Sequence, residues 1–189
     1  MAESDRDSVK RLILTLTVIG AFGSLFLAFV FTWTNPHILE HEARAREEAI
    51  MTVLPDAATY EEEVRNDQTF YIGYDENENR AGVALTVIQG GYQGMIEVMV
   101  GVDPNREEII YISILDHEET PGLGARITEE SFKENFRNKP IDDYELVNRT
   151  PEEPYEVEGI AGATISAETV KEIVMEAGSI ALEHFGGGS

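Results

Sequence analysis

The sequence of 189 residues contains no cysteine. This absence excludes disulfide bonds, thiol nucleophiles, cysteine-ligated iron–sulfur clusters and a lipid anchor built on a cysteine. The length suits one ordinary domain with an appendage, and enough chain remains to bury a core after a membrane segment is set aside.

Basic residues are scarce. The sequence has 14 Lys and Arg against 36 Asp and Glu, which gives a net charge of −22 at pH 7. Acidic and basic residues balance within the first 33 positions, so all of the excess negative charge lies after them. A chain of this charge repels nucleic acid, and we predict no nucleic-acid partner. The simplest interpretation of the acidic residues is a well-solvated surface.

A catalytic constellation is also missing. His117 lies beside Glu118 and Glu119 and could serve as a general base, but no nucleophile pattern accompanies it. The glycines between positions 90 and 94 are not followed by the Gly-Lys-Ser/Thr of a phosphate loop, so turn chemistry explains them better. We therefore predict no catalytic residue.

One short pattern is typical of a metal site. His37-Ile38-Leu39-Glu40-His41 has the H-x-x-E-H spacing of some zinc peptidases, in which the histidines bind the metal and the glutamate is the base. No context for a third ligand follows, and the segment adjoins an apolar run. A charged stem outside a membrane is the favoured interpretation, and we predict no metal site.

That apolar run extends from Leu12 to Trp33 without a charged residue. As a helix it would be about 33 Å long, enough to cross a bilayer. A cleaved signal peptide would have a shorter apolar region and a small-residue cleavage site, so we predict an uncleaved anchor. Residues 1–11 would then form a cytoplasmic tail, and residues 34–68 a juxtamembrane helix and linker, with Pro55 ending that helix.

The middle of the chain alternates with the period of β-strands. Short connections between the strands predict an antiparallel meander. The strands are expected at Phe70–Tyr74, around 83–87, 96–100 and 110–114, and more weakly at Tyr144–Val147. A helix is expected from a Thr128 cap to Arg137, and another follows Thr164. The fold class is therefore α+β, with a domain at 69–185. Residues 186–189, Gly-Gly-Gly-Ser, resemble an artificial linker.

The stretch Gly159–Val170 combines small residues with the start of a helix. Ser166 is expected to cap this helix, which places the Thr164 hydroxyl at a helix N-terminus, where free N–H groups favour an anion. Gly162 and Ala163 leave the hydroxyl accessible. The pattern suits a phosphate that is bound or esterified, although an ordinary turn before a core helix has the same composition.

A second loop, Asp116–Gly124, carries Pro121 and two glycines and is shaped rather than extended. Thr120 and the glycine N–H groups could hydrogen-bond the edge of a polar ring, while Leu123 offers an apolar contact. Taken alone, the loop is better explained as a structural turn.

Three segments together resemble a known family. Ala161-Gly162-Ala163-Thr164 resembles the Ser/Thr-Gly-Ala-Thr motif of FMN-binding domains whose flavin is esterified, through its phosphate, to the last threonine. The segments 117–124 and Gly91-Tyr92-Gln93-Gly94 resemble two further parts of that family, in the same order. The resemblance covers about residues 90–185. The sequence departs from the motif at Ala161, where Ser or Thr is usual, and at Glu158, where Asp is usual.

This resemblance implies a covalent FMN on Thr164, attached by a flavin transferase. Together with the local patterns it predicts the cofactor-binding residues Thr164, Gly162, Ala163, Ser166, Glu119, Thr120, Gly122, Leu123 and Gly124.

The whole-chain layout of tail, anchor, stem and flavin domain resembles the G subunits of Rnf-type ion-translocating ferredoxin:NAD oxidoreductase complexes. The resemblance implies an electron-carrying subunit that performs no complete reaction alone and that assembles with other membrane subunits in the bilayer. Two alternatives stay open: a C-type subunit of the sodium-translocating NADH:quinone oxidoreductase, and a membrane-anchored assembly module without redox activity.

The expected location is the cytoplasmic membrane, with one pass and the flavin domain on the extracytoplasmic side. Three basic residues precede the anchor and two follow it at a distance, which favours an internal N-terminus only slightly. A permanently tethered cofactor is also most useful where a dissociated one would be lost.

Overall fold

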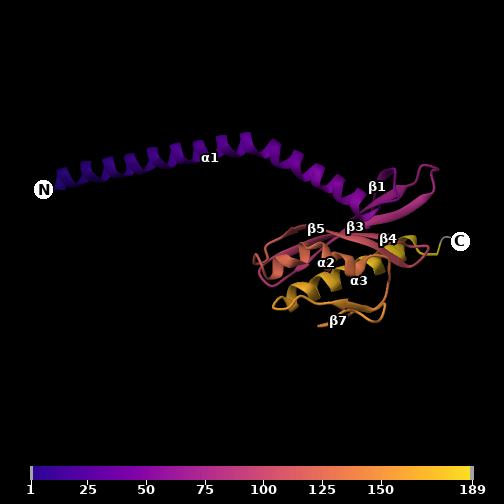
Figure 1. Cartoon of the computed structure of the whole chain (residues 1–189). Helices are drawn as coiled ribbons and strands as arrows, with labels where there is room; N and C mark the ends of the chain where they lie inside the picture. Colours follow the sequence, from indigo (N-terminus) through magenta and orange to yellow (C-terminus); the bar gives the residue numbers. More distant parts are fainter. Residues whose placement is uncertain (1, 188–189) are drawn as a thin grey trace. The chain divides into compact units, whose positions relative to one another are not determined.

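The computed structural model describes residues 2–187, apart from the side chains of residues 2–9, 36, 37 and 39. The chain forms two compact units, Met1–Arg44 and Ala45–Ser189. The long helix α1 (Ala2–Val53) makes up the first unit, and its last residues, from Ala45 onward, belong to the second (Figure 1).

Within the described residues, α1 is the one helix that is long and apolar enough to cross a membrane. Its apolar side chains between Leu12 and Trp33 are exposed in the isolated chain. The hydroxyls of Thr15, Ser24 and Thr32 each donate to the carbonyl four residues earlier, at 2.8 Å. Such bonds satisfy the hydroxyls inside the helix, as a hydrocarbon environment requires.

The second unit is built on a six-stranded antiparallel sheet in the order β1-β2-β3-β4-β5-β6 (Figure 1). The strands are β1 (Thr59–Arg65), β2 (Gln68–Tyr74), β3 (Arg80–Gly90), β4 (Met95–Asp103), β5 (Glu108–His117) and β6 (Lys139–Pro140). Strands β2 to β5 confirm the predicted meander, and the α+β class is confirmed.

Strand β1 lies in the segment expected to be a linker. It pairs with β2 along its whole length, so the sheet begins ten residues earlier than the predicted boundary at Thr69. The strand contains three consecutive glutamates and lies at the edge of the sheet. Charged residues are typical of exposed edge strands, and they hide the apolar alternation on which the prediction relied.

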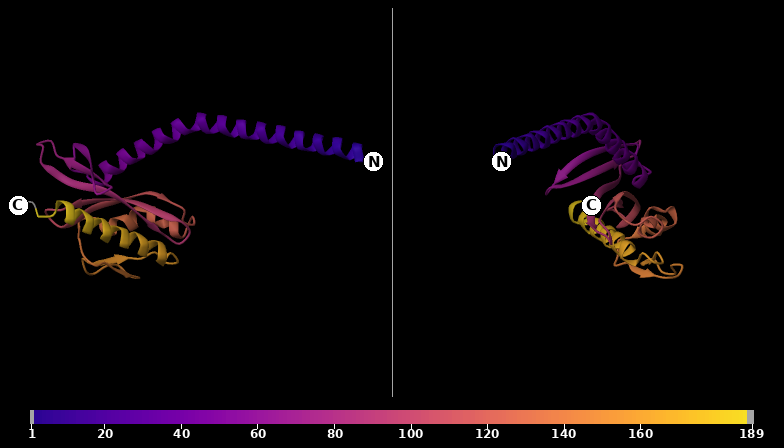
Figure 2. Two further views of the ribbon diagram at one scale, coloured as in Figure 1. Left: turned by 180° about the vertical axis from the view of Figure 1, so that it is seen from behind. Right: turned by 90° about the vertical axis from the view of Figure 1, so that its left-hand side faces the viewer.

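One face of the sheet is covered by helix α3 (Thr164–Phe185), which runs along it in yellow in Figures 1 and 2. The predicted apolar face of this helix is confirmed: Val170, Ile173, Val174 and Ala177 are buried against β3 and β4. These contacts fix the start of α3 relative to the strands and loops around it.

The opposite face is covered by the end of α1. Ile50, Val53 and Leu54 are buried there, and a Cβ at Gly101 would lie only 2.1 Å from the Val53 carbonyl oxygen. The last turns of α1 are therefore part of the domain core, although the sequence predicted a juxtamembrane helix separate from the domain.

The expected helix from Thr128 to Arg137 is broken into short pieces: η1 (Gly124–Thr128), α2 (Glu130–Lys133) and η2 (Glu134–Phe136). The Thr128 hydroxyl bonds back to the Ala125 carbonyl at 2.8 Å and does not cap α2. The predicted apolar face of this segment is confirmed, because Phe132 and Phe136 are buried with their rings 5.6 Å apart. Packing of these two rings holds the segment even though its hydrogen bonding is irregular.

A small parallel sheet joins β7 (Glu145–Val147) to β8 (Glu156–Glu158) and leads into the stretch Gly159–Val170, called the acceptor stretch below because it contains Thr164. The Glu156 carboxylate accepts from the Glu152 N–H at 2.7 Å and from the Arg149 guanidinium at 2.6 Å. The Glu152 N–H and Arg149 hold the pKa of Glu156 below its ordinary value. These bonds close the proline-flanked loop and fix β8 immediately before Gly159.

Candidate functional site

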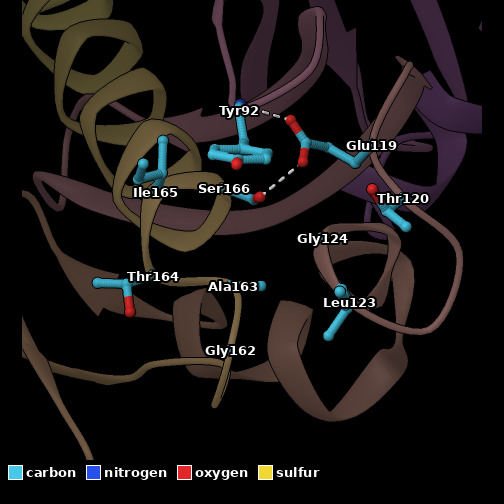
Figure 3. Close-up of a pocket in the computed structure, with 10 residues that line it drawn as sticks. All are labelled: Tyr92, Glu119, Thr120, Leu123, Gly124, Gly162, Ala163, Thr164, Ile165 and Ser166. Atoms are coloured by element: carbon cyan, nitrogen blue, oxygen red, sulfur yellow. Dashed lines mark hydrogen bonds between the residues drawn. The ribbon is translucent and has the colours of Figure 1, made fainter.

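The predicted site residues converge on one cavity of about 370 Å³ between the 119–124 loop and the start of α3 (Figure 3). All of them line it except Gly122. Gly122 lies at the tip of its turn, with a φ of +78° and open space around its Cα, so it shapes the loop without facing the cavity. The residues come from segments about forty positions apart, which the sheet and α3 bring together.

The 119–124 loop is held by its own backbone. The N–H groups of Leu123 and Ala125 both donate to the Thr120 carbonyl at 3.1 Å, which closes the turn that Gly122 permits. The Thr120 hydroxyl donates to the side chain of Gln93 at 2.8 Å. Thr120 is thereby tied to the β3–β4 turn, a segment for which the sequence predicted no role in the site.

Glu119 lies at the back of the cavity and is only 5% exposed. Its Oε1 accepts from the N–H groups of Tyr92 and Gln93 at 2.6 and 3.2 Å, and its Oε2 accepts from the Ser166 hydroxyl at 2.8 Å (Figure 3). One carboxylate therefore joins the β3–β4 turn, the 119–124 loop and α3.

The acceptor stretch turns into α3 at Gly162, whose φ of +82° few other residues adopt. The Ala163 N–H donates to the Ile160 carbonyl at 2.9 Å, and α3 begins at Thr164. The prediction that Ser166 caps this helix is wrong, because its hydroxyl donates to Glu119 and Ala163 occupies the cap position. Thr164 itself is exposed, in the first turn of the helix, where N–H groups lack intrahelical partners.

Large apolar side chains lie around the cavity while remaining exposed. Leu123 is 49%, Ile165 53% and Tyr92 68% accessible. Sequence reasoning included Leu123 but missed the other two. Tyr92 belongs to the segment 91–94, which resembles the family, but only the pairing of β3 with β4 brings that segment to the cavity. Ile165 directly follows Thr164, so extending the motif by one residue would have included it.

The arrangement suits a flat, anionic ligand. Apolar side chains can cover a planar ring, and the start of α3 favours a phosphate. The lining residues include no Lys or Arg. In the described part of the cavity, a phosphate would therefore interact with backbone N–H dipoles and a hydroxyl and not with a cationic side chain. These features fit FMN whose phosphate lies at Thr164.

Two further features of the sequence involve residues that do not line the cavity. Glu158 and Ala161, which depart from the family motif, are exposed and line no part of it. The H-x-x-E-H pattern includes His37, which lies outside the described side chains. Among the side chains that are described, no group of acidic residues and histidines could hold a metal ion.

Comparison with known proteins agrees with this geometry. Residues 91–179 match the family described as FMN-binding domain. The chain is 33% identical to the G subunit of the ion-translocating oxidoreductase complex of Methanosarcina acetivorans, over 88% of this chain and 91% of the other. It is 27% identical to the G subunit of the proton-translocating ferredoxin:NAD(+) oxidoreductase complex of Clostridium ljungdahlii, covering 93% and 92%.

The fold is also seen in a solved structure. The structure of NqrC from Shewanella oneidensis aligns with a TM-score of 0.53 and 19% identity, covering 65% of this chain and 66% of that one. With these matches, the resemblance seen in the three sequence segments is confirmed, and the chain belongs to the family of G subunits of ion-translocating oxidoreductase complexes, with the FMN-binding domain of that family.

Proposed function

We propose that this chain carries one FMN, esterified through its phosphate to Thr164, and acts as an electron-carrying subunit of a membrane-bound ion-translocating ferredoxin:NAD oxidoreductase. The observation that supports this most is the place of Thr164: the residue is exposed, in the first turn of α3, at a cavity with apolar walls. A hydroxyl buried in the core could not be esterified by another enzyme.

FMN would supply the electron-transfer chemistry, and the chain would bind and orient it. The first turn of α3 would stabilise the charge that the phosphate keeps after esterification. Leu123 would contact the ring, and the bonded 119–124 loop would hold that contact in place. A flavin transferase would form the ester from outside, where Thr164 is accessible. Ferredoxin and NAD would be handled by other subunits of the complex.

The simplest test is the colour of the purified protein. Protein made in cells with a flavin transferase should be yellow and should keep its in-gel fluorescence after denaturation. Noncovalent flavin would be released, and a colourless protein would favour the alternative of an assembly module.

A C-type subunit of the sodium-translocating NADH:quinone oxidoreductase is the second candidate, and the shared fold favours it. The high coverage by G subunits favours the first. Co-purification of the tagged chain from its native membrane distinguishes the two by the identity of the companion subunits.

Leu123 should contact the ring and take no part in attachment. Replacement by alanine removes an apolar contact of about 1 kcal/mol from a half-exposed side chain. In Leu123→Ala, attachment should therefore be retained while the visible absorbance or the midpoint potential of the flavin shifts. Titration with visible spectroscopy measures both. If folded Leu123→Ala protein lost its flavin while the residual flavin kept the parent spectrum, the loop would be serving attachment instead.

We also propose that the domain faces the extracytoplasmic side of the membrane. Translocation is not prevented by the net charge of −22, because exported domains cross largely regardless of their charge. Electrons would then have to cross the membrane through partner subunits to reach this flavin.

The absence of cysteine makes this orientation directly measurable. Asn77 is exposed in the β2–β3 turn, so Asn77→Cys should introduce a single accessible thiol. In cells without an outer barrier, an impermeant thiol reagent should label it before lysis. A Ser8→Cys variant, on the other side of the anchor, should react only after lysis. The reverse pattern would place the domain inside.

A further inference from the structure

We propose that Glu119 is a fixed negative charge beside the flavin ring and that it lowers the midpoint potential of the FMN. The proposal rests on the function proposed above and adds a role for one residue of the same cavity. It is carried by the bonding of the carboxylate, by its packing between two glycines and by the lack of a cation near it.

The hydrogen bonds of Glu119 suit a charged carboxylate. Both oxygens of Glu119 act as acceptors: Oε1 accepts two backbone N–H groups, from Tyr92 and Gln93, and Oε2 accepts the hydroxyl of Ser166. Two of the three donors are backbone N–H groups, which can only donate, and hydrogen bonds of this kind favour an ionised carboxylate. Three donors thus stabilise a negative charge on a side chain that is only 5% exposed.

Packing fixes where this charge lies. A Cβ at Gly91 would be 2.4 Å from Oε1, and a Cβ at Gly124 would be 2.2 Å from Oε2. The carboxylate therefore fills the space that two glycines leave, one in the β3–β4 turn and one in the 119–124 loop. Figure 3 shows it between Tyr92 and Ser166, at the cavity that the flavin would enter.

No cation compensates the charge within the part of the chain that the structure describes. None of the ion pairs found there includes Glu119, and the cavity lining has no Lys or Arg. Hydrogen-bond dipoles stabilise the carboxylate without cancelling its net charge, so its field still extends into the cavity.

This field acts on the redox equilibrium of the ring. Each electron that enters the flavin adds one negative charge, which is cancelled only when a proton follows it. A carboxylate at close range and low effective dielectric opposes that added charge. Reduction should consequently be harder than in the same pocket without the carboxylate.

Glu119→Gln tests the charge with little change in shape. The amide oxygen can still accept from the N–H groups of Tyr92 and Gln93, and the amide NH₂ can donate to the Ser166 oxygen. The equilibrium constant for reduction should rise about tenfold, equivalent to an upward shift of about 59 mV for a one-electron step. Spectroelectrochemical titration of the flavinylated full-length protein in detergent measures this.

Glu118→Gln is the matched control. Glu118 is the preceding residue, loses the same charge when replaced, is exposed and does not line the cavity. Solvent screens the charge of Glu118, so the midpoint potential of the flavin in Glu118→Gln should stay near the parent value. Equal shifts in both variants, or no shift in Glu119→Gln, would overturn the proposal.

Ser166→Ala provides a change of opposite sign. It removes one donor but keeps the charge, so the midpoint potential should fall, whereas Glu119→Gln raises it. A purely structural role would move both variants in the same direction, and that result contradicts the proposal. Before flavinylation, amide hydrogen exchange at Tyr92 and Gln93 should stay protected in both variants, which shows that the turn is intact.

Failure of this inference is distinguishable from failure of the proposed function. Parent protein without covalent flavin would contradict the function. Flavinylated variants whose potentials do not differ from the parent would contradict only the role of Glu119.

Discussion

Thr164→Val should abolish covalent flavin while leaving the domain folded. Valine matches the shape of threonine but lacks the oxygen that would bond to phosphorus. The side chain is exposed, so the free energy of unfolding should change by no more than about 0.5 kcal/mol. In-gel fluorescence and intact mass of protein made with a flavin transferase measure the adduct, and urea unfolding measures the stability.

Thr150→Val is the matched control for this experiment. Thr150 is also exposed and lies outside the cavity, so its replacement should leave the adduct at parent level. Retention of the adduct in Thr164→Val would overturn the assignment. So would an adduct mapped to Thr120 or Ser166, which carry the other aliphatic hydroxyls of the cavity lining.

Removal of the end of α1 should destabilise the domain strongly. A soluble fragment that starts at Ala45 should fold as a stable domain, whereas one that starts at Ala58 should be largely unfolded. The shorter fragment lacks Ile50, Val53 and Leu54, each 0–1% exposed in the domain core. Burial of such a side chain contributes about 1.5–3 kcal/mol, and domains are stable by only about 5–15 kcal/mol.

The lost stability originates at one face of the sheet. Removing the helix end exposes Tyr71, Ala84 and Met99, which are buried beneath it. Circular dichroism and urea titration of the two fragments measure the difference. Equal unfolding midpoints would show that the end of α1 only joins the anchor to the domain and contributes nothing to its core.

The central strands and α3 could be predicted because their apolar residues follow the expected periods. The edge strand β1 could not, since its glutamates hide the alternation. The alternation expected along residues 110–114 holds for Ile112 and Ile114 but not for Ile110. Because Gly101 pairs with Tyr111 and Val102 with Ile109, Ile110 is the extra residue of a bulge in β5, and it packs on the side of the sheet opposite to α3. A bulge of this kind has no local sequence signal.

The place of the site followed from local motifs, because the glycines near Thr164 and in the 119–124 loop each indicate a turn. The hydrogen bonds within the site could not be predicted from these motifs. Ser166 was expected to cap its own helix, but it donates to Glu119, which lies 47 residues earlier in the chain. A hydroxyl near a helix start has two uses, and only the packing of α3 on the sheet decides between them.

The central claim is that Thr164 carries the flavin, and peptide mapping of the parent protein tests it most directly. Protein from cells with a flavin transferase would be digested and the fluorescent peptide sequenced by mass spectrometry. The peptide that contains Thr164 should be heavier than its unmodified form by the mass of FMN minus water, with the added mass on that residue. An unmodified Thr164 peptide from yellow protein, or added mass on any other residue, would contradict the account.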